Sequence, residues 1–150
     1  MRTALLAALI IAMLIPSAQV AYSCSCAPPS QKRVFNRSSA VFFGEVVDIW
    51  ESGVPLFDDQ PEVHSYAVKF KVIEYWKGVK SSEVIVHSDL GGLSCHQFAF
   101  AKGKKYLVYA EGRNLIAITG CTRSSPDDSS YFDAEYKGLG KSKKPKVNAE

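Results

Sequence analysis

The sequence has little excess charge and only one long apolar run, and these absences exclude several classes of protein. The 150 residues carry a formal net charge of +3 at pH 7, with 22% charged and 47% hydrophobic residues. That balance excludes a disordered or collagen-like chain. No internal repeat is present, and the length suits one domain with a single core.

Positive charge is concentrated at the end of the chain. Residues 24–136 contain 12 Lys and Arg residues against 14 Asp and Glu residues, so this region does not predict a basic nucleic-acid-binding face. Residues 138–150 are rich in lysine and poor in apolar side chains. We expect this segment to be a disordered, solvated tail, with a weak anchor to anionic polymers or membranes as the alternative.

The single apolar run indicates a signal peptide over residues 1–23. Arg2 precedes twelve apolar residues, Ala4 to Ile15, which are too few to span a bilayer and end at Pro16. Small residues at Ala21 and Ser23 predict cleavage before Cys24. Cleavage after Ala18 or Ala21, or a lipoprotein-type site before Cys24, fits less well. We therefore expect a secreted, extracellular protein without a membrane span (periplasmic or lipid-anchored if the source is bacterial).

Four cysteines in an exported chain predict two disulfides, formed by Cys24, Cys26, Cys95 and Cys121. A Cys24–Cys26 bridge would be strained. Two pairings of these cysteines with Cys95 and Cys121 remain open, and either fixes the N-terminal segment to the later half of the chain. A soft-metal site or a redox role is the competing interpretation.

Alternating apolar residues predict five strands and a mainly β fold. The expected strands are Ala40–Ile49, Ser65–Trp76, Glu83–His87, Lys105–Glu111 and Leu115–Thr119. Gly44 predicts a bulge in the first strand. Residues 51–62 are expected to form a polar loop, and Gly112-Arg113-Asn114 a tight hairpin turn.

Two short helices are expected beside these strands. One is capped by Ser30 and runs through Phe35; the other lies around Tyr131–Tyr136, with Gly138 as its stop. The candidate caps of the second helix are Asp127, Asp128 and Ser129. Five short strands with one or two helices favour a small closed barrel of the OB type, which leaves no free sheet edge.

The segment Cys24-Ser25-Cys26-Ala27-Pro28-Pro29 resembles the start of the tissue inhibitors of metalloproteinases (TIMPs), which have a netrin-like OB barrel. The resemblance extends over residues 24–137 and is most specific in the cysteine spacing. Its other matches are Phe35, Ser38–Val41, Tyr75-Trp76-Lys77-Gly78, Cys95, Tyr106-Leu107-Val108 and Cys121. It implies a netrin-like domain at 24–137 with Cys24–Cys95 and Cys26–Cys121 bridges.

Two features depart from the family pattern. Asn36 occupies the position where a third bridge would start, and no further cysteine remains to pair there. The family's cysteine-rich second domain is replaced by the lysine-rich tail. Asn36-Arg37-Ser38 is also a glycosylation sequon.

The resemblance implies inhibition of a zinc metalloendopeptidase by a monomer that has no cofactor of its own. The free amine and carbonyl of Cys24 would chelate the target's catalytic zinc. Ser25 would enter the specificity pocket, and Cys26, Ala27 and Pro28 would lie along the cleft. The other contacts implied by the family are Arg37, Gly92, Leu93 and Ser94.

Alternatives without inhibition also fit these residues. The chain is also consistent with a non-inhibitory extracellular netrin-like binding module. In that case Ser25 is only a spacer, Pro28-Pro29 a stiff lead-in to the helix, and Gly91-Gly92 a turn. An enzyme is not indicated, because the sequence has no phosphate loop, no zincin motif and no nucleophile–base pair at a recognisable spacing.

Overall fold

The computed structural model describes residues 29–56, 65–89, 99–117 and 122–146. In chain order its elements are α2 (Gln31–Arg37), β1 (Ala40–Ser52), β2 (Ser65–Lys77), β3 (Glu83–Ser88), β4 (Lys105–Ala110), β5 (Ser125–Pro126) and α3 (Phe132–Gly138). The strands form one antiparallel sheet in the order β3-β2-β1-β4-β5. The prediction of a mainly β fold with two short helices is confirmed.

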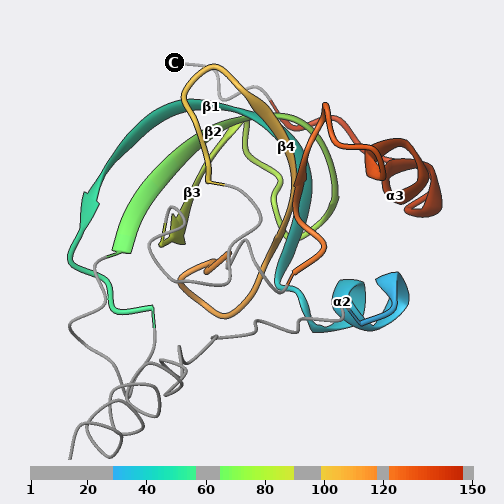
Figure 1. Cartoon of the computed structure of the whole chain (residues 1–150), viewed down its shortest axis with the longest axis horizontal. Helices are drawn as coiled ribbons and strands as arrows, with labels where there is room; N and C mark the ends of the chain where they lie inside the picture. The colour runs from blue at the N-terminus through green and yellow to red at the C-terminus, as the bar shows by residue number, and fades with distance from the viewer. Residues whose placement is uncertain (1–28, 57–64, 90–98, 118–121, 147–150) are drawn as a thin grey trace, which may run out of the picture.

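The sheet is strongly curved, and both helices lie outside it (Figure 1). The long strands β1 and β2 produce this curvature, and their pairing register shifts at three places, including the step from Phe43 to Gly44. A Cβ at Gly44 would lie 2.9 Å from the carbonyl oxygen of Lys71. The predicted bulge at Gly44 is therefore confirmed, because only glycine allows the two backbones to approach this closely.

Alternate residues of β1 and β2 bury their side chains in a core on the concave face. Phe42 and Phe70 are fully buried there, and their ring centroids are 5.3 Å apart in an edge-to-face arrangement. Phe70 also contacts Phe100, with ring centroids 5.3 Å apart. In β2, Val68, Phe70 and Val72 are buried while Lys71 is exposed, as the sequence alternation predicts.

A second cluster covers the outer face of β1 and β4, where the helices pack. Its buried members are Val34 of α2, Val41 of β1, and Leu107 and Tyr109 of β4. Phe132 and Leu139 pack against it from α3 and the residue after that helix. Because β1 and β4 are covered on both faces, they hold α2 and α3 in fixed positions.

The fifth strand differs from the sequence expectation. β5 is Ser125–Pro126, which pairs with Leu107 and Tyr106 of β4 in a region expected to lead into a helix. Within the expected strand Leu115–Thr119, only Ile116 forms bridges among the described residues 115–117, and residues 118–121 lie outside the described ranges. The sheet is not closed by a regular fifth strand in the described part of the chain.

Ser30 is the N-cap residue of α2, as expected, whereas the N-cap of α3 is Tyr131 and not Asp127, Asp128 or Ser129. Neither N-cap side chain makes a capping hydrogen bond. The carbonyl oxygen of Ser30 instead accepts bonds from the amides of Arg33 and Val34. The helices also extend past the expected ends, to Arg37 and Gly138. Gly140, with φ of 70°, is the first left-handed residue after α3.

Residues 140–146 are held against β2, in contrast to the expected disordered tail. Lys143 exchanges two backbone hydrogen bonds with Tyr75, of 2.8 and 2.9 Å, and the amide of Lys146 donates to Lys80. The lysine-rich composition has little to bury, but β3 pairs only with residues 66–71 of β2. The later part of β2 therefore has backbone groups left to pair, and residues 140–146 use them.

Candidate functional site

Most of the predicted contact residues lie outside the described ranges. This applies to Cys24, Ser25, Cys26, Ala27 and Pro28, to Gly92, Leu93, Ser94 and Cys95, and to Cys121. The described residues that border these segments are Pro29, Asp89, Ala99, Ala117 and Thr122.

Arg37 is the one predicted contact residue that the structure describes. It is the last residue of α2, and its side chain is 59% exposed. Its Nε donates to Glu111 Oε1 at 2.8 Å. The guanidinium is thereby held at the end of β4. Asn36, the sequon residue beside it, is exposed.

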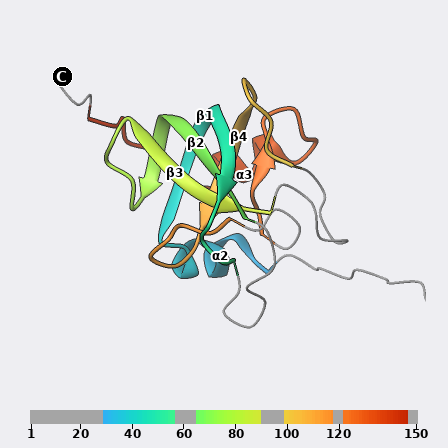
Figure 2. The same ribbon diagram turned by 90° about the vertical axis from the view of Figure 1, so that its left-hand side faces the viewer.

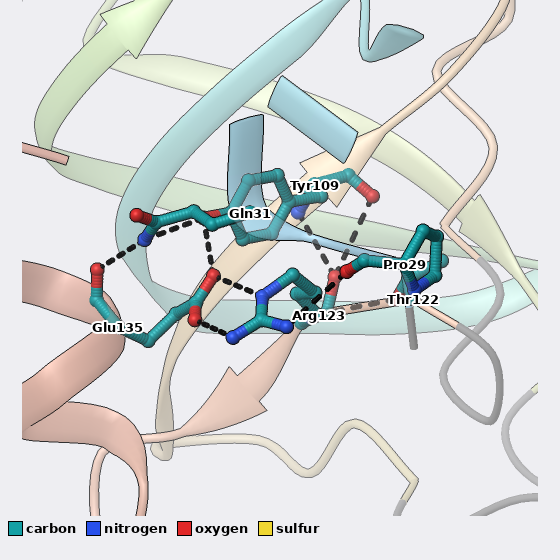
Figure 3. A network of polar contacts seen from close by, with 7 residues as sticks. Pro29, Gln31, Tyr109, Thr122, Arg123 and Glu135 are labelled. Atoms are coloured by element: carbon teal, nitrogen blue, oxygen red, sulfur yellow. Dashed lines mark hydrogen bonds and ion pairs between the residues drawn. The ribbon is translucent and has the colours of Figure 1, made fainter. Parts of the chain in front are cut away.

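A buried polar network lies where the chain leaves the N-terminal segment (Figure 3). At its centre is Glu135 of α3, whose side chain is 4% exposed. Arg123 pairs with both of its carboxylate oxygens, through Nε at 2.7 Å and through a short contact from Nη2. The Tyr109 hydroxyl of β4 donates to Glu135 Oε1 at 2.7 Å. The buried carboxylate is thus bonded on both oxygens, as burial of a charge requires.

The network joins the described residues that follow two of the three cysteine-bearing segments. Arg123 Nη1 donates to the carbonyl oxygen of Pro29 at 3.2 Å. Gln31 Nε2 donates to the carbonyl oxygen of Glu135 at 2.6 Å, which fixes the start of α2 to α3. Pro29 follows Cys26 by three residues, and Arg123 follows Cys121 by two. We call the set Pro29, Gln31, Tyr109, Arg123 and Glu135 the N-terminal clamp.

The electrostatics of the N-terminal clamp suit a structural role. Burial, and then the hydrogen bond to Glu135, raise the pKa of the Tyr109 hydroxyl. The hydrogen bond to Glu135 also raises the pKa of Arg123. Tyr109 therefore remains a proton donor and Arg123 remains charged near neutral pH, so neither group is poised for proton transfer.

Sequence reasoning missed the clamp because its members are far apart in the chain. Gln31 and Glu135 are 104 positions apart, and Tyr109 and Glu135 are 26 apart. No local motif links them. The available signal is the spacing of Glu135, three residues after Phe132 and four before Leu139, which places it on their helix face and predicts a buried partner without identifying it.

A second polar contact joins Ser52 at the end of β1 to His87 of β3. Ser52 Oγ and His87 Nδ1 are 3.0 Å apart, and Ser52 Oγ also accepts a bond from the amide of Val54. Burial lowers the pKa of His87, so the ring is neutral at pH 7. The backbone of His87 is bonded to Leu115 and Ala117 on its other side. The contact thus holds these strand ends together.

Neither a metal-binding cluster nor a membrane-crossing helix is found in the part of the chain that the structure describes. No three His, Cys, Asp or Glu side chains among those residues are placed to hold a metal ion. No helix there is long or apolar enough to cross a bilayer.

Comparison of the chain with models of known protein families and with curated proteins gives no match.

Proposed function

We propose that the protein is a secreted inhibitor of zinc metalloendopeptidases that acts through the free N-terminus of Cys24. The observation that carries this proposal is the contact between Arg123 and the carbonyl oxygen of Pro29 at 3.2 Å. The contact fixes Pro29, three residues after Cys26, to Arg123, which lies two residues after Cys121 and just before β5. Rigid attachment at this point limits the entropy that an N-terminal wedge would lose on docking.

The contact is compatible with the pairing Cys26–Cys121, which the family resemblance implies. Three extended residues reach at most about 11 Å and two about 7 Å. Chain lengths of this size allow a bridge, which needs Cα atoms about 5.5 Å apart, and they leave the choice of pairing to the family resemblance. Cys24 and Cys95 would form the second bridge, as in the family that the sequence resembles.

Two bridges around Ile116 support an OB-type barrel. Ile116 pairs in parallel with His87 of β3 and antiparallel with Glu111, which directly follows β4. The amide of Ala117 donates to the carbonyl oxygen of His87 at 2.8 Å. A segment that pairs with both β3 and the end of β4 would close the sheet into a barrel. We propose that residues 115–119 act as this closing strand.

In the proposed complex the α-amine and carbonyl oxygen of Cys24 form a five-membered chelate with the zinc of the target protease. They occupy the coordination position that otherwise holds the catalytic water. Ser25 enters the specificity pocket, and Cys26, Ala27 and Pro28 follow the cleft. Gly92, Leu93 and Ser94 flank the wedge, and Arg37 contacts the rim. The amine must be unprotonated, and its ordinary pKa is about 8, so inhibition weakens as pH falls.

The first test is the intact mass of the secreted, untagged protein. The expected mass corresponds to a chain that begins at Cys24 with a free amine and two disulfides. A start at Tyr22, a blocked or lipid-modified amine, or four free thiols would contradict the chelating wedge.

The second test is inhibition of a panel of zinc endopeptidases by two extended variants. One carries an added alanine before Cys24, and the matched control carries an added alanine after Glu150. We expect the first to lose at least about 100-fold in potency because the chelate is displaced, and the control to remain unchanged. Both should unfold at the temperature of the parent. Equal potency of the two variants would contradict the mechanism, and absence of inhibition by the parent would favour the binding-module alternative.

A further inference from the structure

The C-terminal strap, residues 140–146, is an extended segment fixed to the side of the sheet. It leaves α3 and lies beside the turn between β2 and β3 (Figure 2). Trp76 Nε1 donates to the carbonyl oxygen of Gly140 at 3.0 Å. Glu74 accepts from Ser142 Oγ at 2.6 Å and from Lys144 Nζ at 2.7 Å. The strap is thus anchored through its backbone and through alternate side chains.

The anchoring leaves the other lysines of the strap at the surface. Ser142 and Lys144 face Glu74, and successive side chains of an extended segment point to opposite sides. Lys141 and Lys143 are therefore directed away from Glu74, about 7 Å apart. Lys146 is bonded through its amide to Lys80, so these two lysines adjoin. Lys80, Lys141, Lys143 and Lys146 are all exposed and form no ion pair within the described ranges.

Positive charge is concentrated in the strap and in the two sequence segments around its anchor points. Residues 74–81 and 136–146 contain seven lysines and one acidic residue, Glu74. The rest of residues 24–150 contains ten basic and fourteen acidic residues. The strap and its surroundings therefore carry +6 on a body of −4. A field of this kind attracts an extended anion and orients it along the strap.

We propose that the C-terminal strap, together with Lys80, is a binding surface for a linear sulfated polysaccharide. Its lysines form a row on a fixed backbone, which matches a chain with repeated anionic groups. This surface does not depend on the proposed inhibition, because the strap uses none of the residues of the N-terminal clamp.

Two other polyanions fit the same surface less well. A membrane-bound segment needs apolar side chains beside its cations, but the large hydrophobic residues exposed in the described ranges are Trp50, Ile85 and Tyr131, all outside the strap. Single-stranded nucleic acids are held by exposed aromatic rings and by arginine. The strap contains neither, and nearby Trp76 packs edge-to-face against Tyr136.

The experiment measures binding of the untagged, disulfide-intact protein to heparin as the probe. The test variant is Lys141→Gln/Lys143→Gln/Lys146→Gln. The matched control, Lys71→Gln/Lys105→Gln/Arg113→Gln, removes the same charge from exposed positions outside the strap. Because each lost contact removes about 0.7 from the slope of log affinity against log salt, we expect the test variant to lose about two in slope. We also expect it to lose at least tenfold in affinity, with the control close to the parent.

Equal losses in the two variants would overturn the proposal, since net charge alone would then explain binding. So would binding of the parent to phosphatidylserine vesicles or to an oligothymidylate as tight as its binding to heparin at equal salt. Protease inhibition measured on the same two variants should be unchanged. Failure of heparin binding with inhibition intact would reject this surface alone.

Discussion

At the scale of single residues, the N-terminal clamp depends on the hydrogen bonds and positive charge that Arg123 and Tyr109 supply to the buried Glu135 carboxylate. Replacing Arg123 with Met keeps the aliphatic part of the side chain but leaves Glu135 with only the Tyr109 hydroxyl as its side-chain partner. An uncompensated buried charge is strongly destabilising, so we expect R123M to lower the free energy of unfolding by about 3 kcal/mol. Urea denaturation of the disulfide-intact protein measures this loss.

The matched control is R37M, which removes the exposed Arg37–Glu111 pair. Surface pairs contribute about 0–1 kcal/mol, and the Arg37 side chain is 59% exposed. R37M should therefore remain close to the parent in stability. If R123M were no less stable than R37M, the clamp would not be the fixed attachment that the proposed wedge requires.

Gly78 is a second residue on which the fold depends locally. Its φ is +76°, and a Cβ there would overlap the carbonyl oxygen of Ser39 and lie 3.0 Å from the Cα of Ala40. Gly103 has nearly the same φ, +78°, with nothing within 4 Å of a Cβ. We expect G103A to cost about 1 kcal/mol from backbone strain alone, and G78A at least about 2 kcal/mol more because β1 must shift.

Thermal or urea unfolding of the two alanine variants measures this difference. Because the φ values match, the difference isolates the steric contact between Gly78 and the start of β1. Equal stability of G78A and G103A would mean that the approach of the β2 end to Ser39 is not a constraint on the fold.

At the scale of elements, local pattern predicts the structure wherever one face of a strand is buried. The alternation in β2 identified its boundaries to within one residue, because Val68, Phe70 and Val72 must face the core. By contrast, β5 and the strap have no apolar pattern. They are held by backbone pairing with β4 and β2, and such pairing is not encoded in the composition of the paired segment.

The attachment of the strap to β2 also depends on pH. The hydrogen bond from Lys144, followed by those from Ser142 and Tyr136, lowers the pKa of Glu74 from 4.5 to about 2. The lowered pKa means that Glu74 contributes stability at pH above 4.5 and loses that contribution as the pH falls toward 2. We therefore expect the strap to loosen over this interval, because protonation removes the charge that attracts Lys144.

The indole N–H resonance of Trp76 measures this transition, since that group donates to Gly140 at the start of the strap. Its shift should change with a midpoint near pH 2, while the resonance of Trp50, the other tryptophan, serves as an internal control. In the Glu74→Gln variant the step should be absent. A midpoint near 4.5, or a step that persists in E74Q, would show that Glu74 does not hold the strap.

At the scale of the whole molecule, the candidate site combines a local motif, which the sequence reveals, with a network of residues that are distant in the chain, which it does not. The Cys24-Ser25-Cys26 motif is local enough to predict the proposed wedge, whereas the clamp requires Gln31, Tyr109 and Glu135 to meet in space. That meeting depends on α2 and α3 covering the outer face of β4. No pattern within either helix indicates this arrangement.

Closure of the sheet determines whether the wedge is mounted on a barrel or on an open sheet. If residues 115–119 close a barrel, the amide of Ala117 is bonded to His87 at 2.8 Å within a continuous ladder. It should then exchange with solvent as slowly as the amides of the β2–β3 ladder. The amide of Arg113, in the turn after β4, should exchange rapidly, because local opening of an exposed turn requires little free energy. Hydrogen exchange measured by NMR distinguishes a closed barrel from an open sheet.

If Ala117 exchanged as fast as Arg113, the bridges at Ile116 would be local contacts and β3 would be a free edge. The cysteine-bearing segment after residue 117 would then lack the rigid support that inhibition through Cys24 requires.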